Sequence, residues 1–182
     1  MELHFPNLVR LEITHEYALG ITDDDVTLLA IGLPSLVSLD LNGAPGNIEP
    51  GPTKLTIRCL RSLATWLHEL MDLSLFLDAR QDIDPTLPPV AFQSLEQLFL
   101  CTSPIDEAAR ERVTLHLART LPTYAVMTSE RDYVSEWDYT PPPFEPSRFA
   151  IWKRVEADLE LIMSAKRDWL ADAQAQVSKT QW

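Results

Sequence analysis

Four segments of the chain share one spacing, in which a leucine is followed by apolar residues three and five positions later. The segments are Leu8-Leu11-Ile13, Leu36-Leu39-Leu41, Leu70-Leu73-Leu75 and Leu95-Leu98-Leu100. They begin 28, 34 and 25 residues apart. The second half of each segment alternates apolar and polar positions, which is typical of a strand buried on one face. We therefore predict four parallel strands in repeating units, with a degenerate fifth strand at residues 124–127.

The residues ahead of these strands predict helices. An apolar Leu-Ala-x-x-Leu pattern begins at Leu29, Leu63 and Leu117. Thr22 and Asp25 have the spacing of a capping box at the start of the first helix. Residues 55–67 and 105–121 have the same helical character. Each unit is then a strand, a loop and a helix, and stacked units can bury apolar faces that one unit alone cannot.

The second unit resembles the leucine-rich repeats of F-box and F-box-like proteins, especially the divergent fungal ones. The matching residues are Ile21-Thr22-Asp23, Val26, Leu29-Ala30, Leu33-Pro34, Leu36 and Leu39-Asp40-Leu41. The resemblance implies an α/β fold: a leucine-rich-repeat solenoid over residues 1–127, whose short curved parallel sheet has helices on its convex side. The family's Asn or Cys three residues past each strand is replaced by Glu16, Ala44, Asp78 and Ser103. We therefore expect less regular loops.

Proteins of this family carry an F-box of about 40 residues ahead of the repeats. Met1 lies only a few residues before the first predicted strand. We therefore expect no F-box in this chain, and a truncated product or a missing upstream segment. The first strand would then leave an unpaired sheet edge.

Long loops are expected at residues 42–53 and 78–91, which are rich in glycine, proline or aspartate. Residues 128–147 are acidic, aromatic and proline-rich, and form either an interaction segment or a cap over the open end of the sheet. Residues 148–182 are expected to form an amphipathic C-terminal helix and a frayed tail from residue 171. Its apolar face contains Ile151, Trp152, Val155, Leu159, Ile162, Met163, Trp169 and Leu170. This face either packs on the solenoid or binds a partner.

Charge and processing signals narrow the function further. The chain has 15 Lys and Arg residues against 27 Asp and Glu residues, a formal net charge of −12. This acidity argues against nucleic acid and against an anionic membrane as partners. The sequence shows no secretory signal and no long apolar run. Cys59 and Cys101 are expected to be separate buried thiols, so we predict a cytoplasmic or nuclear protein.

Motifs of catalysis and cofactor binding are absent from the sequence. It contains no glycine-rich phosphate loop, no GxSxG and no Cys-x-x-Cys. The motif beginning His68-Glu69 lacks the second histidine of a zinc-protease helix, because Asp72 stands there. The run Asp23 to Asp25 is better explained by helix capping than by a cation site. We predict a non-enzymatic protein with no catalytic residue, cofactor or metal.

The polar strand positions between the leucines are the candidate partner-binding site. They are Arg10, Glu12, Ser38, Asp40, Asp72, Ser74, Gln97 and Phe99. On a concave sheet they form either a slightly acidic face for a protein with a basic edge, anchored on an exposed Phe99, or simply a solvated surface. The resemblance implies the substrate-recognition part of an F-box-type ubiquitin-ligase adaptor, whose partner is a ubiquitination substrate.

Two alternatives to this function remain. One is a truncated or stand-alone repeat protein with no ubiquitin-ligase role. The other is a small hydrolase that uses the loop carboxylates Asp78, Asp82 and Asp84.

Overall fold

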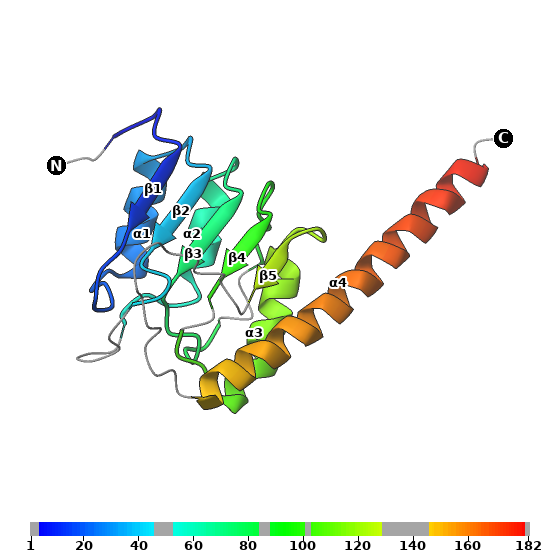
Figure 1. Cartoon of the computed structure of the whole chain (residues 1–182). Coiled ribbons are helices and arrows are strands. Elements are labelled where there is room, and N and C mark those ends of the chain that lie inside the picture. Colours follow the sequence, from blue (N-terminus) through cyan, green and yellow to red (C-terminus); the bar gives the residue numbers. More distant parts are fainter. Residues whose placement is uncertain (1–3, 46–52, 84–87, 101–102, 129–145, 181–182) are drawn as a thin grey trace, which may run out of the picture.

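A computed structural model describes residues 4–45, 53–83, 88–100, 103–128 and 146–180. Five strands form one parallel sheet, in which their spatial order follows the sequence (Figure 1). They are β1 (Arg10–Ile13), β2 (Ser38–Leu41), β3 (Asp72–Leu75), β4 (Gln97–Phe99) and β5 (Val126–Thr128). The helices are α1 (Asp23–Gly32), α2 (Cys59–Trp66), α3 (Glu107–Thr120) and α4 (Pro146–Thr180). The predicted α/β class, the parallel sheet and the fifth strand are confirmed.

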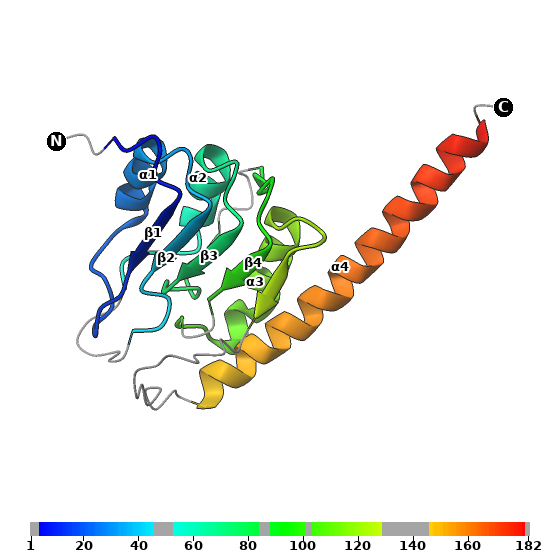
Figure 2. The ribbon, with the colours of Figure 1, turned by 45° about the horizontal axis from the view of Figure 1, so that its top comes forward.

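The register of the sheet places the repeated leucines side by side. Leu39 pairs with Leu73, and Leu73 pairs with Leu98. These side chains are buried toward α1, α2 and α3, which all lie on one side of the sheet (Figures 1 and 2). Burying one such leucine contributes roughly 2 kcal/mol to stability. The repeated leucine spacing is therefore the main source of the core.

The capping box at the start of α1 is confirmed. The Thr22 hydroxyl oxygen accepts from the Asp25 N–H at 3.3 Å, and the Thr22 N–H donates to the Asp25 carboxylate at 2.9 Å. Hydrogen bonds from the Thr22 side chain and backbone lower the pKa of Asp25. Asp23 instead reaches the next unit, where its carboxylate accepts from the Thr56 N–H at 2.8 Å and the Thr56 hydroxyl at 2.6 Å. The acidic run therefore caps α1 and ties it to the following unit.

The unit between β3 and β4 departs from the general strand, loop and helix pattern, and its described part agrees with the long loop expected at residues 78–91. Its described residues, 76–83 and 88–96, contain no helix. Prolines at 88 and 89 disfavour one, because proline lacks the N–H that a helix interior needs. α1 packs along α2, whereas α2 and α3 meet at few points. The expectation of one helix per unit is wrong here, and the missing helix leaves a groove between α2 and α3.

Polar side chains brace two of the loops that follow the strands. The Ser103 hydroxyl accepts from the Leu77 N–H at 3.1 Å and donates to the Leu75 carbonyl at 3.3 Å. Asn42, in the left-handed region at φ 54°, accepts from the His15 N–H at 2.9 Å and donates to the Tyr17 carbonyl at 2.8 Å. These contacts provide bracing where the sequence pattern indicated that it was missing.

α4 packs against α3 beside β5 (Figures 1 and 2). Its buried side chains are Ile151, Trp152, Val155, Leu159 and Met163. Trp152 is fully buried, and its Nε1 donates to the Ser103 carbonyl at 2.8 Å. The predicted C-terminal helix is therefore confirmed, and its first half packs on the sheet domain.

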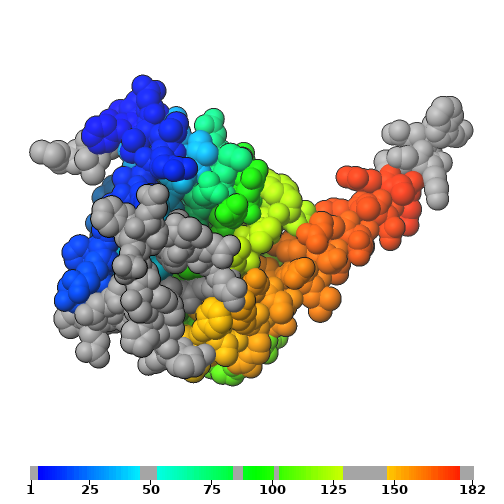
Figure 3. All heavy atoms as spheres, viewed as in Figure 1, coloured from blue at the N-terminus to red at the C-terminus, as the bar shows by residue number. Residues whose placement is uncertain are grey.

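The second half of α4 corrects two expectations. Trp169 and Leu170, predicted on the packed face, are 70% and 42% exposed. The reason is length: α4 has 35 residues, about 52 Å of helix, and α3 has 14, about 21 Å. The red part of α4 therefore extends away from the rest of the protein (Figure 3). The helix continues to Thr180, so the fraying expected from residue 171 is not observed.

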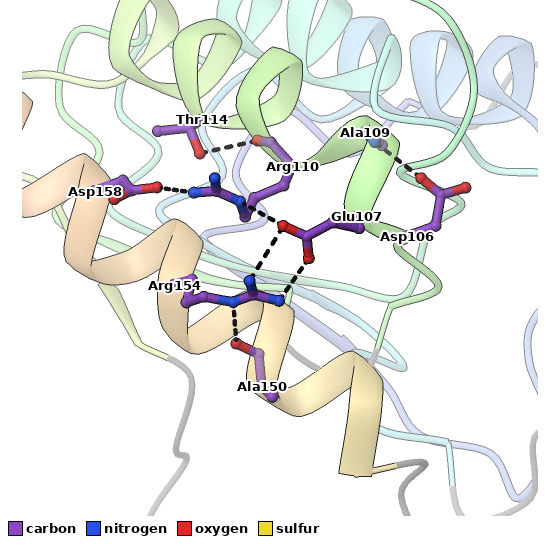
Figure 4. A network of polar contacts seen from close by, with 8 residues as sticks. All are labelled: Asp106, Glu107, Ala109, Arg110, Thr114, Ala150, Arg154 and Asp158. Atoms are coloured by element: carbon purple, nitrogen blue, oxygen red, sulfur yellow. Dashed lines mark hydrogen bonds and ion pairs between the residues drawn. The ribbon is translucent and has the colours of Figure 1, made fainter.

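Charged side chains join α3 to the first half of α4 (Figure 4). Arg110 pairs with Glu107 at 3.1 Å and with Asp158, and Arg154 pairs with the same Glu107 at 2.5 Å. Exposed ion pairs of this kind contribute about 0–1 kcal/mol each. The apolar contacts of α4 therefore dominate its docking.

Two further cations of α4 bind backbone oxygens. Lys166 Nζ donates to the Ala118 carbonyl at 2.8 Å, and an Arg167 Nη1 donates to the Thr123 carbonyl at 2.6 Å. Cations suit the last turn of a helix because its carbonyls point outward there. Lys166, which interrupts the apolar stripe, thus completes the C-terminal turn of α3.

Some predicted features fall outside the described residues. They are Asp84, Cys101, nearly all of the predicted linker or cap at 128–147 and most of the loop at 42–53. Among the helices that are described, none has the length and apolar character needed to cross a bilayer.

Candidate recognition surface

The side of the sheet opposite α1, α2 and α3 carries the polar strand positions. The strand register aligns them in two rows. The first row contains Arg10, Ser38, Asp72, Gln97 and Val126, and the second row contains Glu12, Asp40, Ser74, Phe99 and Thr128. All eight predicted site residues therefore lie on one face, as their alternation with the leucines requires.

The two rows differ in exposure. In the first row Arg10 and Gln97 are exposed, and Ser38 and Asp72 are half-buried. In the second row Glu12 is exposed, but three predicted residues are not. Asp40, Ser74 and Phe99 are only 8%, 5% and 7% exposed. The prediction that Phe99 is an exposed anchor is therefore wrong, since its ring belongs to the buried cluster.

The turn after β2 explains part of this burial. The Gly43 N–H donates to the Asp40 carboxylate at 3.0 Å, which folds the chain back over the second row. A Cβ on Gly43 would lie 1.9 Å from the Ser74 Oγ, so the glycine backbone sits directly on Ser74. Asn42 supplies the left-handed residue of the turn, a conformation that asparagine tolerates well. The Asn42-Gly43 pair was visible as a turn signal, but its position over the second row was not.

The first row ends in a hollow of about 350 Å³. Its described lining residues are Glu96, Gln97, Tyr124, Val126 and Thr128. Tyr124 and Val126 are 54% and 56% exposed, and the Tyr124 hydroxyl donates to the Gln93 carbonyl at 2.9 Å. The exposed aromatic residue of this face is therefore Tyr124. The sequence pattern did not reveal this role because it included Tyr124 in the fifth strand, whereas β5 begins two residues later.

The charges of this face are mostly negative. The carboxylates at or beside the first row belong to Glu12, Asp72 and Glu96. At the β1 end of this row, Arg10 carries a positive charge. Glu12 and Glu96 are exposed and Asp72 is half-buried. Carboxylates at an exposed rim attract a cationic partner and exclude an anionic one. The face therefore suits a ligand with basic groups.

The described loop carboxylates lie in separate contacts. Asp78 is 4% exposed, and its two oxygens bind the Arg80 Nε and Nη2 atoms at 2.9 Å each. Burial opposes the charged form of Asp78, but hydrogen bonds from Arg80 outweigh it, so the pKa of Asp78 is lowered. Asp82 pairs with Arg112 at 3.1 Å. An ionised, fully bonded Asp78 suits loop bracing better than proton transfer.

Thiol and metal chemistry have few candidates among the described residues. Within them, no three His, Cys, Asp or Glu side chains gather in a metal-binding arrangement. His68 lies in the turn after α2 and Asp72 begins β3, so the zinc-protease resemblance does not correspond to one helix. Cys59 is fully buried. Burial, and then the charge of Asp23, raise the pKa of its thiol well above the ordinary value.

Comparisons with protein-family models, with curated proteins and with solved structures give no match.

Proposed function

We propose that this chain is a non-enzymatic recognition module that binds a protein through the face of its sheet opposite α1, α2 and α3. The observation that carries the proposal is the continuous first row from Arg10 through Asp72 to Val126, which ends in the hollow beside Tyr124. A short parallel sheet holds these side chains in a fixed line. Such a broad surface suits a protein or peptide better than a small substrate.

The chemistry of the face indicates how a partner would bind. Tyr124 and Val126 provide exposed apolar area at one end, and tyrosine is enriched among residues that dominate interface energies. Asp72, Glu96 and Glu12 provide acceptors for lysine or arginine side chains. A basic segment with one apolar residue for the hollow is therefore the proposed ligand.

We extend the proposal to the leucine-rich-repeat type of fold. Parallel strands in sequence order, leucines in register and loop bracing by Asn42 and Ser103 support it. With the resemblance to F-box proteins, the partner is a ubiquitination substrate, bound in the cytoplasm or nucleus by the substrate-recognition part of a ligase adaptor. In that case, proteasome inhibition raises the cellular level of the partner. An unchanged level favours a stand-alone recognition role.

Affinity capture with quantitative mass spectrometry tests the binding face. The variants are Asp72→Arg and Tyr124→Ala, and the charge-matched control is Glu160→Arg, on the exposed side of α4. Losing a buried charge contact or an aromatic anchor costs about 2 kcal/mol or more, so capture of specific partners should fall at least tenfold. The control should retain them. Equal capture by all three variants, each with a native circular dichroism spectrum, contradicts the proposal.

A further inference from the structure

A second concave region lies on the opposite side of the sheet. Because no helix stands in the described residues between β3 and β4, α2 and α3 are separated, and a groove of about 700 Å³ lies between them. Residues 88–90 of the connecting segment form part of its wall. A volume of this size is in the range of small-molecule sites.

The groove is cationic although the chain is acidic. Its described lining contains Arg58, Arg61, Arg112 and Arg119, against one carboxylate, Glu111. In α3, residues 112, 116 and 119 follow one helical face. Clustering four of the chain's 15 basic residues here, within a net charge of −12, creates a local site for negative charge.

Most of these guanidinium groups are held by backbone oxygens, which leave their charge uncompensated. Arg58 donates to the Asp82 carbonyl at 2.8 and 3.1 Å, and Arg61 donates to the Pro88 carbonyl. Arg112 donates to the Arg80 carbonyl at 3.0 Å and also pairs with the exposed Asp82 carboxylate. The Arg119 side chain is exposed, and its guanidinium forms no hydrogen bond or ion pair with any described residue.

Two nitrogen atoms in the wall lack a partner. The Arg112 Nε and the His116 Nε2 are buried and make no hydrogen bond in the described part of the chain. Buried polar atoms in folded proteins are normally satisfied, so such orphans indicate a missing acceptor. Burial, and then the neighbouring Arg119 charge, lower the pKa of His116, so its imidazole is neutral near pH 7.

The remaining wall is apolar. Ile83, Val90 and Leu115 line the groove together with Pro88 and Pro89, and Leu115 is 41% exposed. An inorganic ion would leave this apolar surface in water, whereas a ligand with a hydrocarbon body would cover it.

We propose that the groove between α2 and α3 binds a small amphipathic anion, a carboxylate or phosphate group attached to an apolar body. The anionic group lies against Arg112 and Arg119, because guanidinium groups match both oxyanions in geometry and charge. The apolar body lies along Leu115 and Val90. This site is independent of the recognition surface, from which the sheet separates it.

Isothermal titration calorimetry in low salt tests the proposal with octyl phosphate and octanoate. Saturable binding of either probe at one site per chain is expected, and the stronger probe identifies the head group. Inorganic phosphate and neutral octyl glucoside should bind at least tenfold more weakly, because each lacks one half of the ligand. Added salt should weaken the binding of the anion, because salt screens the charges of partly exposed arginines.

Variants then locate the bound anion. Arg119→Gln removes an exposed charge with no described partner, and Leu115→Asp places a like charge beside the anion, so neither disturbs the core. We expect each to lower the affinity about tenfold or more. Lys54→Gln, which removes another exposed cation that does not line the groove, is the matched control and should leave the affinity unchanged.

Four results would overturn the proposal. The first is that neither octyl phosphate nor octanoate binds, and the second is that octyl glucoside or inorganic phosphate binds as tightly as they do. The third is that a hexaglutamate peptide binds as tightly, and the fourth is that Arg119→Gln leaves the affinity unchanged.

Discussion

Trp152 should be the side chain that attaches α4 to the rest of the protein. Its side chain is fully buried, with an exposure of 0%, and its Nε1 donates to the Ser103 carbonyl at 2.8 Å. Truncating a buried tryptophan to alanine costs about 3–5 kcal/mol through lost burial and the cavity left behind. The unpaired Ser103 carbonyl adds about 1 kcal/mol. We therefore expect Trp152→Ala to destabilise the protein by about 4–6 kcal/mol.

The control for this prediction lies on the same helix. Trp169 is 70% exposed, so Trp169→Ala removes the same side chain and changes helix propensity equally, without opening a cavity. Its effect should stay within about 0.5 kcal/mol. Trp152→Phe, which keeps most of the packing and loses the hydrogen bond, should cost about 1–2 kcal/mol.

Urea unfolding followed by circular dichroism measures these differences. With a slope of about 2 kcal/mol per molar urea, Trp152→Ala should lower the midpoint by about 2–3 M. If α4 detaches before the rest unfolds, the same cost appears as faster amide exchange over residues 151–163. A midpoint and an exchange pattern in Trp152→Ala that match those of Trp169→Ala would refute the packing argument.

Three further predictions follow from individual contacts. Gly43→Ala should destabilise the protein by about 1–3 kcal/mol, because the new Cβ would meet the Ser74 Oγ at 1.9 Å. In urea unfolding, adding Ser74→Ala should recover most of this loss. An equal cost in the single and double variants would contradict the contact. The lowered pKa of Asp78 means that its carboxylate stabilises the fold above its unfolded value near 3.8, and that this stabilisation is lost as pH falls through the lower folded pKa. Arg80→Gln should therefore cost about 1 kcal/mol at pH 7 and progressively less below pH 3.8, and a cost independent of pH would exclude the pair as its cause. Cys59 is buried and the pKa of its thiol is raised. In a Cys101→Ser background it should therefore resist a disulfide reagent at pH 8 until urea unfolds the chain. Rapid modification of the native protein would show that the thiol is accessible.

Much of the fold could be predicted because its signals are local and repeated. The leucine spacing identified the strands, and the Thr22 to Asp25 spacing identified the start of α1 together with its capping contacts. The long loop at residues 78–91 was expected, but the groove that it leaves between α2 and α3 was not. The repeat pattern suggested one helix per unit, although the prolines at 88 and 89 argued against it.

The candidate surface was only partly predictable. Alternation along the strands correctly placed the eight residues on one face. It could not show that Asp40, Ser74 and Phe99 are buried, because burial depends on what packs over a residue from distant parts of the chain. The same limit applies to α4: its apolar stripe runs to Leu170, but the length of α3 decides where packing ends. The groove arginines come from α3 and from α2 with its N-cap residue. They line one groove because the described residues between β3 and β4 contain no helix.

The central claim is that partners bind the face of the sheet opposite α1, α2 and α3, and site-specific photocrosslinking tests it most directly. A benzophenone side chain is placed at Gln97, an exposed residue of the first row, or at Leu28, which is 68% exposed on α1 behind the sheet. Irradiation in cells should join the partner to the Gln97 variant and not to the Leu28 variant. Crosslinks from Leu28 without any from Gln97 would contradict the claim and place recognition on the helical side.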